Sequence, residues 1–272
     1  TRTRNGFDQG FGYVKRPRYS RKDKHYDKKV SFEGIRALKK FGSYDEKFFG
    51  WIFFASPHTP YHTHDYEGMP GESQLERYRQ DLRYGDENIG LVLDYLEQSG
   101  LFDKTIVVFV GDHGEEFGEH GGRWHNNIFR ECVHVPMIIR IPGIEGRALD
   151  RPTSTMYIFP WLLQHGGPDD IGRHVELLLQ RNIGPMLRAT DGAVVIEMVG
   201  QRLNKYSLVY SDYHLIYDFP SKHTLLFDIA RDPGEKHNVF TADPVRMQKF
   251  LRRARGYLDT RAAIERLQIV KH

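Results

Sequence analysis

The 272-residue sequence is poor in cysteine and in long apolar runs. It contains one cysteine, Cys132, which excludes an internal disulfide and any metal cluster built from several cysteines. Its apolar runs, such as residues 51–55 and 106–110, have the length of strands, whereas a bilayer span needs roughly 20 apolar residues. The first residues lack both an apolar targeting core and an initiating Met, which favours a processed or truncated product. We therefore expect neither a disulfide scaffold nor a membrane span.

A large excess of one charge is also missing. The chain has 39 basic and 36 acidic side chains and a formal net charge of +3. Much of the basic excess lies between residues 15 and 40, where we interpret it as a solvated face rather than as a nucleic-acid site. Hydrophobic residues make up 39% of the sequence and charged residues 28%, which is ordinary for a globular protein. No nucleic-acid partner is predicted.

Between residues 44 and 142 the sequence alternates between element types. Apolar runs at residues 51–55, 105–110 and 136–141 predict three buried strands, and helical spacing predicts a long helix over residues 73–98, with Gly100 as its carboxy-terminal cap. Buried strands separated by helices indicate the α/β class, with a mostly parallel sheet flanked by helices.

After residue 143 the pattern changes. Two further helices are expected at residues 155–166 and 175–188. Short strand-like runs at residues 194–198, 205–210, 215–219 and 225–229 then predict a small antiparallel sheet, followed by a final helix over about residues 243–259. We accordingly place a boundary near residue 190, between residues 1–190 and a small β-sheet and helix subdomain at residues 191–272.

Two polar, histidine-rich loops follow predicted strands. Loops at the carboxyl ends of neighbouring strands in an open α/β sheet converge on one crevice, so residues 56–62 and residues 111–116 are expected to face a common cavity. Asp112 and His113 offer a hard oxygen and an imidazole nitrogen at a point where flanking glycines let the chain bend, which suits a divalent metal such as Ca²⁺, Mg²⁺, Mn²⁺ or Zn²⁺. Alternatively, Asp112 caps a helix and His113 merely packs.

Residues 111–121 (GDHGEEFGEHG), with residues 124–125 and 135–139 after them, resemble the second metal-binding motif of the sulfatase family in the alkaline phosphatase superfamily. Four more segments resemble the same family in the same order, so the resemblance covers nearly the whole chain: residues 5–11, 56–61, 84–105 and 226–238.

The resemblance implies roles for four residues. It makes Asp112 and His113 ligands of one divalent metal ion, with Ca²⁺ as the first choice. It makes His58 the histidine that contacts the ester group, and it gives His125 the place of a cation that binds the transferred anion or protonates the leaving oxygen. Each histidine also has a structural interpretation, His58 as a turn residue between two prolines and His125 as a residue packed by Trp124.

Other candidates carry less weight. Glu116 and His120 are within reach of the metal loop, yet glutamates there are typical of helix starts. His62 and His64 are interpreted as residues at the rim of the pocket. Arg123 could attract an anionic substrate or could simply be a surface charge. Cys132 is interpreted as a small buried hydrophobic residue.

The family's first metal pair and its Cys/Ser-x-Pro-x-Arg nucleophile segment, in which formylglycine is formed, do not occur in these residues. The resemblance therefore implies a sulfate-ester hydrolase of which this chain carries half of the active site, with residues 1–190 as the carboxy-terminal half of the sulfatase-like catalytic domain. The missing amino-terminal half of the same protein would be its partner. The family also implies an extracytoplasmic location. Two alternatives stay open: a phosphate or phosphonate ester hydrolase or phosphotransferase of the same superfamily, and a truncated homologue that acts only in binding.

Overall fold

The computed structural model describes residues 9–20, 22–44, 46–167, 192–199, 204–218, 221–241 and 244–269. The chain divides into two compact units. The first, called the helical unit below, comprises Thr1–Ile106 and Ile141–Ile144, and the second, called the sheet unit, comprises Val107–Arg140 and Glu145–His272. None of the described helices is both long and apolar enough to cross a membrane.

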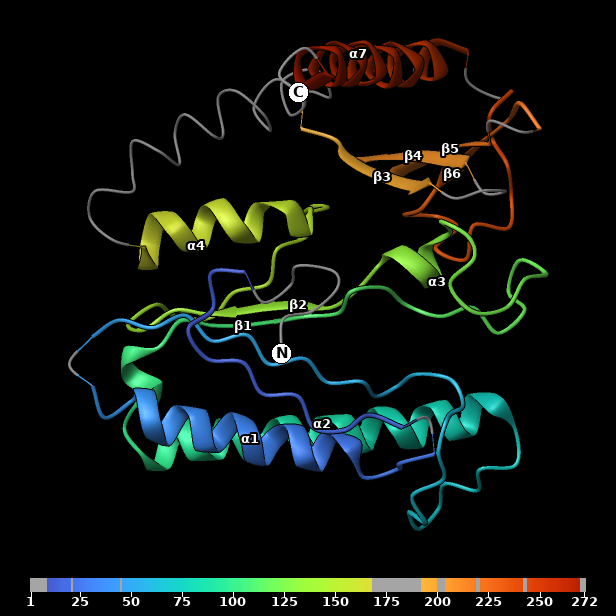
Figure 1. The fold of residues 1–272 in the computed structure, drawn as a ribbon. Coiled ribbons are helices and arrows are strands. Elements are labelled where there is room, and N and C mark those ends of the chain that lie inside the picture. The colour runs from blue at the N-terminus through green and yellow to red at the C-terminus, as the bar shows by residue number, and fades with distance from the viewer. Residues whose placement is uncertain are drawn as a thin grey trace. The chain divides into compact units, whose positions relative to one another are not determined.

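Two helices form the body of the helical unit, α1 (Tyr26–Phe41) and α2 (Gln74–Gln98), and they pack against each other (Figure 1). The sequence predicts α2 correctly. Ser73 and Glu76 form a reciprocal capping box at its start, and Gly100 adopts the left-handed backbone conformation (φ +69°) that ends a helix at low cost. A buried hydrogen bond of 2.7 Å from Ser31 Oγ to the Asn88 carbonyl joins the two helices.

Helix α1 was not predicted, because its buried face carries little apolar surface. The buried positions are Asp27, Val30, Ser31 and Gly34, which have helical spacing but only one large apolar side chain among them. A Cβ atom on Gly34 would lie 2.9 Å from Ile52 Cδ1, so a glycine permits this close approach. The lysines of α1 are exposed, as the interpretation of a solvated basic face requires.

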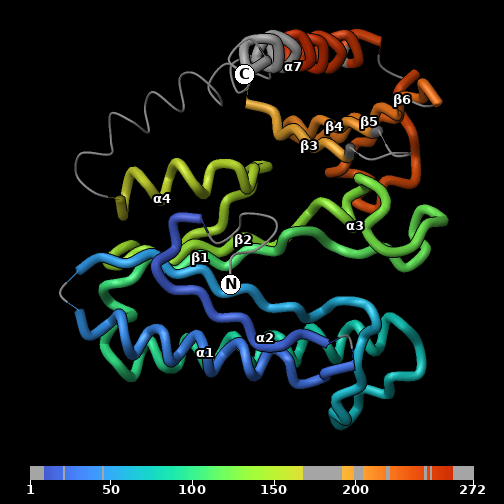
Figure 2. The backbone as a smooth tube through the Cα atoms, in the orientation of Figure 1, coloured from blue at the N-terminus to red at the C-terminus, as the bar shows by residue number. Residues whose placement is uncertain are grey.

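The strand pairing in the first half of the chain differs from the prediction. Strands β1 (Val107–Val110) and β2 (Met137–Arg140) form an antiparallel pair in which Val107 lies opposite Arg140. We expected them to be parallel, which requires a crossover connection and usually a helix. The connection holds only the one-turn helix α3 (Arg130–Val133), and Figure 2 shows the green chain leaving β1 and returning through α3 to β2.

The third expected strand, at residues 51–55, is extended but belongs to no ladder in the part of the chain that the structure describes. At the end of this segment the backbone N–H groups of Ala55 and Ser56 donate to the carboxylate of Asp27 instead of to a neighbouring strand. A side chain has thus taken the place of a strand partner there.

The carboxy-terminal sheet agrees with the prediction. Its strands are β3 (Val194–Val199), β4 (Asn204–Tyr210), β5 (Tyr213–Asp218) and β6 (His223–Asp228), all antiparallel and in sequential order. Helix α7 (Pro244–Ile269) covers one face of this sheet. Their shared core consists mainly of large apolar side chains: Tyr206, Leu208, Leu215, Leu226, Phe250 and Tyr257. The α/β class, with a small antiparallel sheet and a final helix, is confirmed.

Three shorter elements complete the described fold: the one-turn helix η1 (Phe102–Lys104), and η2 (Thr155–Tyr157) leading directly into α4 (Ile158–Gly166). The last two match the helix expected at residues 155–166. The helix expected at residues 175–188, the domain boundary near residue 190 and most of the motif at residues 5–11 lie outside the described residues, so the division into domains stays a prediction.

Candidate active site

Asp112 and His113 directly follow the end of β1 and point their polar atoms toward each other. Asp112 Oδ1 accepts a hydrogen bond of 2.9 Å from the His113 backbone N–H, and Asp112 Oδ2 lies 3.9 Å from His113 Nε2. The other ring nitrogen, His113 Nδ1, lies 2.9 Å from the Gly114 carbonyl oxygen. A carbonyl only accepts, so Nδ1 carries a proton in this contact and Nε2 is the ring nitrogen that faces Asp112. Both side chains are exposed, and they offer one oxygen and one nitrogen ligand on the same side.

His125 is brought beside this pair by the closure of the loop between them. The backbones of Glu116 and Trp124 exchange two hydrogen bonds, of 2.9 and 3.0 Å, and Trp124 takes a left-handed conformation with φ +66°. The ring of His125 consequently lies 3.9 Å from the ring of His113, centroid to centroid, at an interplanar angle of 34°. His125 Nδ1 also lies 3.4 Å from Glu115 Oε1.

Gly114 allows the loop to lie directly on helix α3. Its N–H donates a 2.7 Å hydrogen bond to the Cys132 carbonyl, and a Cβ atom at this position would lie only 2.1 Å from the Glu131 carbonyl oxygen. No side chain fits in that space. The conformation of the residue next to His113 is therefore fixed by backbone contact with α3.

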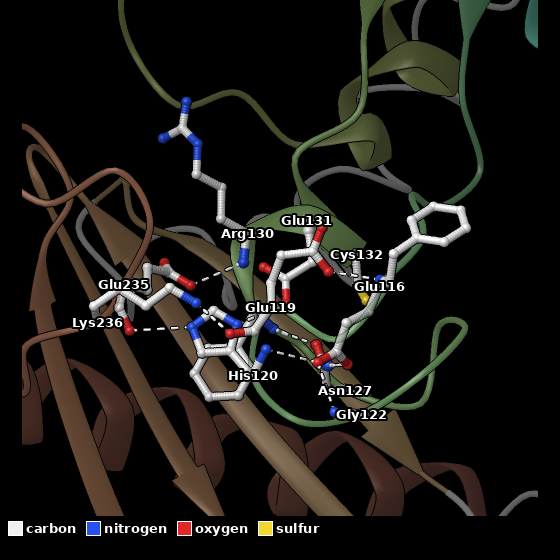
Figure 3. A network of polar contacts seen from close by, with 12 residues as sticks. Glu116, Glu119, His120, Gly122, Asn127, Arg130, Glu131, Cys132, Glu235 and Lys236 are labelled. Atoms are coloured by element: carbon white, nitrogen blue, oxygen red, sulfur yellow. Dashed lines mark hydrogen bonds and ion pairs between the residues drawn. The ribbon is translucent and has the colours of Figure 1, made fainter. Parts of the chain in front are cut away.

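Glu116 holds the rest of the loop from inside. This buried carboxylate accepts hydrogen bonds from the backbone N–H groups of His120 and Gly122, at 2.9 and 2.8 Å, and from the amide of Asn127 (Figure 3). The expectation that Glu116 is a charge at a helix start was wrong, because no helix begins there and its partners are the N–H groups of its own loop.

His120 lies between two oxygen acceptors. Its Nδ1 is 2.7 Å from Glu131 Oε1, its Nε2 is 3.1 Å from the Glu235 carbonyl oxygen, and its ring stacks on Phe129 at 3.7 Å. Both ring nitrogens of His120 are thus occupied by acceptor groups of the protein. Glu116, His120 and Glu131 place one donor atom each within 4.8 Å of one another, as a metal site would. Their hydrogen bonds to one another and to the backbone already use these atoms.

Cys132 is buried under the loop, with 2% of its surface exposed. Burial, and then the neighbouring carboxylate of Glu131, raises the pKa of the Cys132 thiol to about 12. The group is therefore a neutral thiol near pH 7, and its interpretation as a small buried hydrophobic residue is confirmed.

His58 lies in the helical unit, on a loop that two buried carboxylates hold. Asp27 of α1 accepts the N–H groups of Ala55 and Ser56 at 2.8 and 3.0 Å, and Asp81 of α2 accepts the His62 N–H at 3.0 Å. His58 itself is exposed, and its Nδ1 lies 2.7 Å from the Thr59 carbonyl oxygen, which leaves Nε2 with a free lone pair.

One neighbour of His58 was misread from the sequence. His64 is not a rim residue, because its side chain is only 4% exposed, stacks on Tyr84 at 4.1 Å and contacts Asp81 at 2.7 Å. His62 is half-buried. The structure thus brings together Asp112, His113 and His125 in the sheet unit, and it places His58 on a separately held loop of the helical unit.

Residues 2–168, which contain both histidine loops, match the family model described as Sulfatase. The chain belongs to the sulfatase family. The N-acetylglucosamine-6-O-sulfatase of Bacteroides thetaiotaomicron is 32% identical over 179 residues, which cover 61% of this chain and 32% of that protein. The ulvan-active sulfatase of Formosa agariphila is 30% identical over 235 residues, or 74% of this chain and 45% of that protein.

Solved structures agree with this membership. The yidJ protein of Bacteroides fragilis superimposes with a TM-score of 0.70 at 21% identity, covering 86% of this chain and 58% of that one, which shows the shared fold. A protein solved with its substrate D-glucosamine-2-N,6-O-disulfate superimposes with a TM-score of 0.50 at 26% identity, over 68% of this chain and 41% of that one. The chain spans less than half the length of the curated relatives it matches.

Proposed function

We propose that this chain forms part of the active site of an enzyme that hydrolyses sulfate esters with the help of one divalent metal ion. The observation that carries the proposal is the grouping of Asp112, His113 and His125 on the loop after β1, which the buried carboxylate of Glu116 holds from inside. Membership of the sulfatase family supplies the class of reaction.

Asp112 and His113 fit the role of metal ligands. The carboxylate is exposed, and His113 donates its Nδ1–H to the Gly114 carbonyl, which orients the ring as is usual for a histidine that binds a metal through Nε2. Two ligands are too few for a tight site, so further ligands must come from residues outside this loop. We propose Ca²⁺, with Mg²⁺, Mn²⁺ and Zn²⁺ as alternatives. When bound, such an ion polarises the oxygens of the ester.

His125 and His58 are proposed to act on the transferred group. His125 lies beside His113 on the same loop, and a histidine at that place can bind an anionic sulfate or protonate the leaving alcohol. His58 presents its free Nε2 to solvent from a loop fixed at both ends, so it can contact a ligand without paying the entropy of ordering the loop.

The nucleophile is proposed to come from a part of the protein other than these residues. Cys132 is buried and protonated, and no Cys/Ser-x-Pro-x-Arg segment occurs in the sequence. A formylglycine in that other part, within an extracytoplasmic enzyme, is what the family resemblance predicts. The relatives agree on the sulfate group but differ in the alcohol that carries it, with N-acetylglucosamine, choline and steryl sulfatases among them. The proposal therefore stops at a sulfate ester.

The test is turnover by the complete protein with p-nitrophenyl sulfate and p-nitrophenyl phosphate, with added Ca²⁺. We expect sulfate turnover to exceed phosphate turnover, and His125→Ala to lower kcat by roughly 10²- to 10⁴-fold. His223→Ala, which removes an exposed histidine of the carboxy-terminal sheet, is the control and should leave kcat unchanged. Preference for phosphate would move the chain to the phosphohydrolase alternative. No turnover of either ester would favour the alternative in which the chain is a truncated homologue that acts only in binding.

A further inference from the structure

Glu235, in the turn after β6, is buried in the same network as the metal loop although it lies more than 100 residues from that loop in sequence (Figure 3). Its Oε2 accepts a 2.8 Å hydrogen bond from the Arg130 backbone N–H, and its Oε1 lies 2.6 Å from His214 Nδ1. Its carbonyl oxygen accepts from His120 Nε2 at 3.1 Å. Only 2% of its surface is exposed. One buried residue thus makes three polar contacts to three different parts of the sheet unit.

Two features show that holding Glu235 in place is costly. Its backbone is left-handed, with φ +53°, a conformation that a residue with a side chain rarely adopts. Its carboxylate is withdrawn from water, which is unfavourable unless hydrogen bonds or charges compensate. Strain of this kind persists where the surrounding contacts over-determine it, and it is concentrated at functional sites. A turn that served only to connect β6 to α7 would need neither feature.

From Glu235 one line of contacts runs to the metal ligands. Arg130 is the first residue of α3, so the carboxylate fixes the start of that helix. Two residues later, the Cys132 carbonyl accepts the 2.7 Å hydrogen bond from the Gly114 N–H. Gly114 directly follows His113. A displacement of α3 would therefore shift the backbone that carries the Asp112–His113 pair.

A second line runs from Glu235 to His125. The Glu235 carbonyl holds His120, and the backbone N–H of His120 donates to Glu116 Oε1. The backbone of Glu116 is paired with Trp124, which directly precedes His125. Lys236, the next residue of the turn, also donates to the Glu119 carbonyl. The first line of contacts ends at the Asp112–His113 pair, and the second ends at His125.

We propose that Glu235 is a positioning residue: it ties the carboxy-terminal sheet to the loop of residues 111–131 and so sets the spacing between the metal ligands and His125. The proposal deepens the proposed function and rests on it for the role of the loop. Its structural content, that the backbone at Gly114 depends on Glu235, stands apart from any metal.

Glu235→Gln is the first test, in the complete protein. The amide is close in size, but it can accept from only one of the two donors and turns its own NH₂ toward the other. We expect amide hydrogen exchange to speed at least tenfold in peptides covering residues 111–125, without added metal, while strands β3–β5 keep their protection. We expect the Kd for Ca²⁺ to rise about 10- to 100-fold, as when groups that orient the ligands are changed at other metal sites. Asp212→Asn, an exposed turn carboxylate in the same unit, is the matched control and should change neither.

A pair of variants at Arg130 keeps the test clear if Glu235→Gln unfolds. Arg130→Pro removes the N–H that Glu235 accepts, at the first position of a helix where proline is tolerated, and Phe129 already has the extended conformation (φ −71°, ψ 165°) that proline requires before it. Arg130→Ala removes the side chain and keeps the N–H. We expect faster exchange in residues 111–125 and weaker Ca²⁺ binding in the proline variant alone.

The outcomes separate the two claims. Wild-type protein that binds no Ca²⁺ contradicts the proposed function, whereas the exchange data still decide on Glu235. Unchanged exchange at residues 111–125 in Arg130→Pro, or an equal change in Arg130→Pro and Arg130→Ala, overturns the positioning role, whatever the metal affinity. Uniform loss of protection through β3–β5 in a folded Glu235→Gln protein would reduce Glu235 to a residue of general stability.

Discussion

The two histidine loops are held by the same chemical device but from different places. In the helical unit, the loop that carries His58 is fixed by Asp27 and Asp81, which project from α1 and α2 and accept backbone N–H groups of the loop. In the sheet unit, the loop that carries His113 and His125 is fixed by Glu116, within the loop itself, and by Glu235, in another loop.

This difference determines which other parts of the protein must be folded before each loop is fixed. Helices that pack on each other place Asp27 and Asp81 whether or not the loop is formed, so the loop docks on a ready scaffold. Neither Glu116 nor Glu235 lies in a helix or strand, so each is in place only when its own loop is formed. We therefore expect the sheet-unit loop to form cooperatively and to be the more sensitive of the two to a single substitution.

The largest effect is expected for Glu116→Ala. The change leaves three donors without their acceptor, the partly buried N–H groups of His120 and Gly122 and the buried Asn127 amide. Each orphaned donor costs about 1–3 kcal/mol, so the free energy of unfolding should fall by about 3 kcal/mol or more in urea denaturation. Glu119→Ala, an exposed residue of the same loop, should cost under about 1 kcal/mol. Equal costs would contradict the account of a loop held from inside.

A smaller effect is expected for Asp27→Ala. Two backbone N–H groups, those of Ala55 and Ser56, lose their acceptor, and both are only partly buried, so water can replace part of the interaction. The free energy of unfolding should fall by about 2 kcal/mol, with faster hydrogen exchange at residues 55–56. Asp86→Ala, an exposed position on α2, is the control. If Asp27→Ala costs more than Glu116→Ala, the comparison between the loops is reversed.

The candidate site was predicted better than the contacts that hold it. Asp112, His113 and His125 could be proposed from a motif and from their place after a strand, because such signals are local in sequence. Glu235 and Asp27 could not, because a buried carboxylate looks like a surface charge until the fold brings a distant N–H to it. The one sequence signal for Glu235 was its place in the family-like segment at residues 226–238.

The fold shows the same division between features that are local in sequence and features that depend on distant residues. The helical spacing of α2 with its Gly100 cap and the short strand-like runs of the carboxy-terminal sheet are local patterns, and both predictions were confirmed. Helix α1 was missed because its buried face includes Asp27 and Ser31, whose burial depends on partners in residues 55–88. The direction of β2 was wrong because it depends on the path of a long loop, which composition does not encode.

A chemical probe can sharpen the picture of the packed sheet-unit loop. The pKa of Cys132 is raised from 9.0 to about 12, chiefly by burial, so the folded state favours the neutral thiol. This contribution to stability is complete below pH 9 and is lost as the pH rises toward 12. We expect iodoacetamide to leave Cys132 unmodified in folded protein at pH 8 and to modify it rapidly in urea, measured by intact mass. Rapid modification of the folded protein would show that the loop opens readily.

The smallest effect on stability is expected for His58→Ala. The side chain is exposed, and it hydrogen-bonds to the neighbouring Thr59 carbonyl, so the free energy of unfolding should change by less than about 0.5 kcal/mol. Its proposed role predicts a fall in kcat of the complete enzyme at unchanged stability. A clear loss of stability with normal kcat would make His58 the turn residue of the alternative interpretation.

The central claim is that Asp112 and His113 hold a divalent cation, and calorimetric titration of the complete protein with Ca²⁺ tests it most directly. We predict one binding event in the wild type and in Asp212→Asn, and affinity at least about 100-fold weaker in Asp112→Asn, because a charged ligand is replaced by a neutral one of the same shape. Equal affinity in the wild type and Asp112→Asn would contradict the assignment of this loop as the metal site.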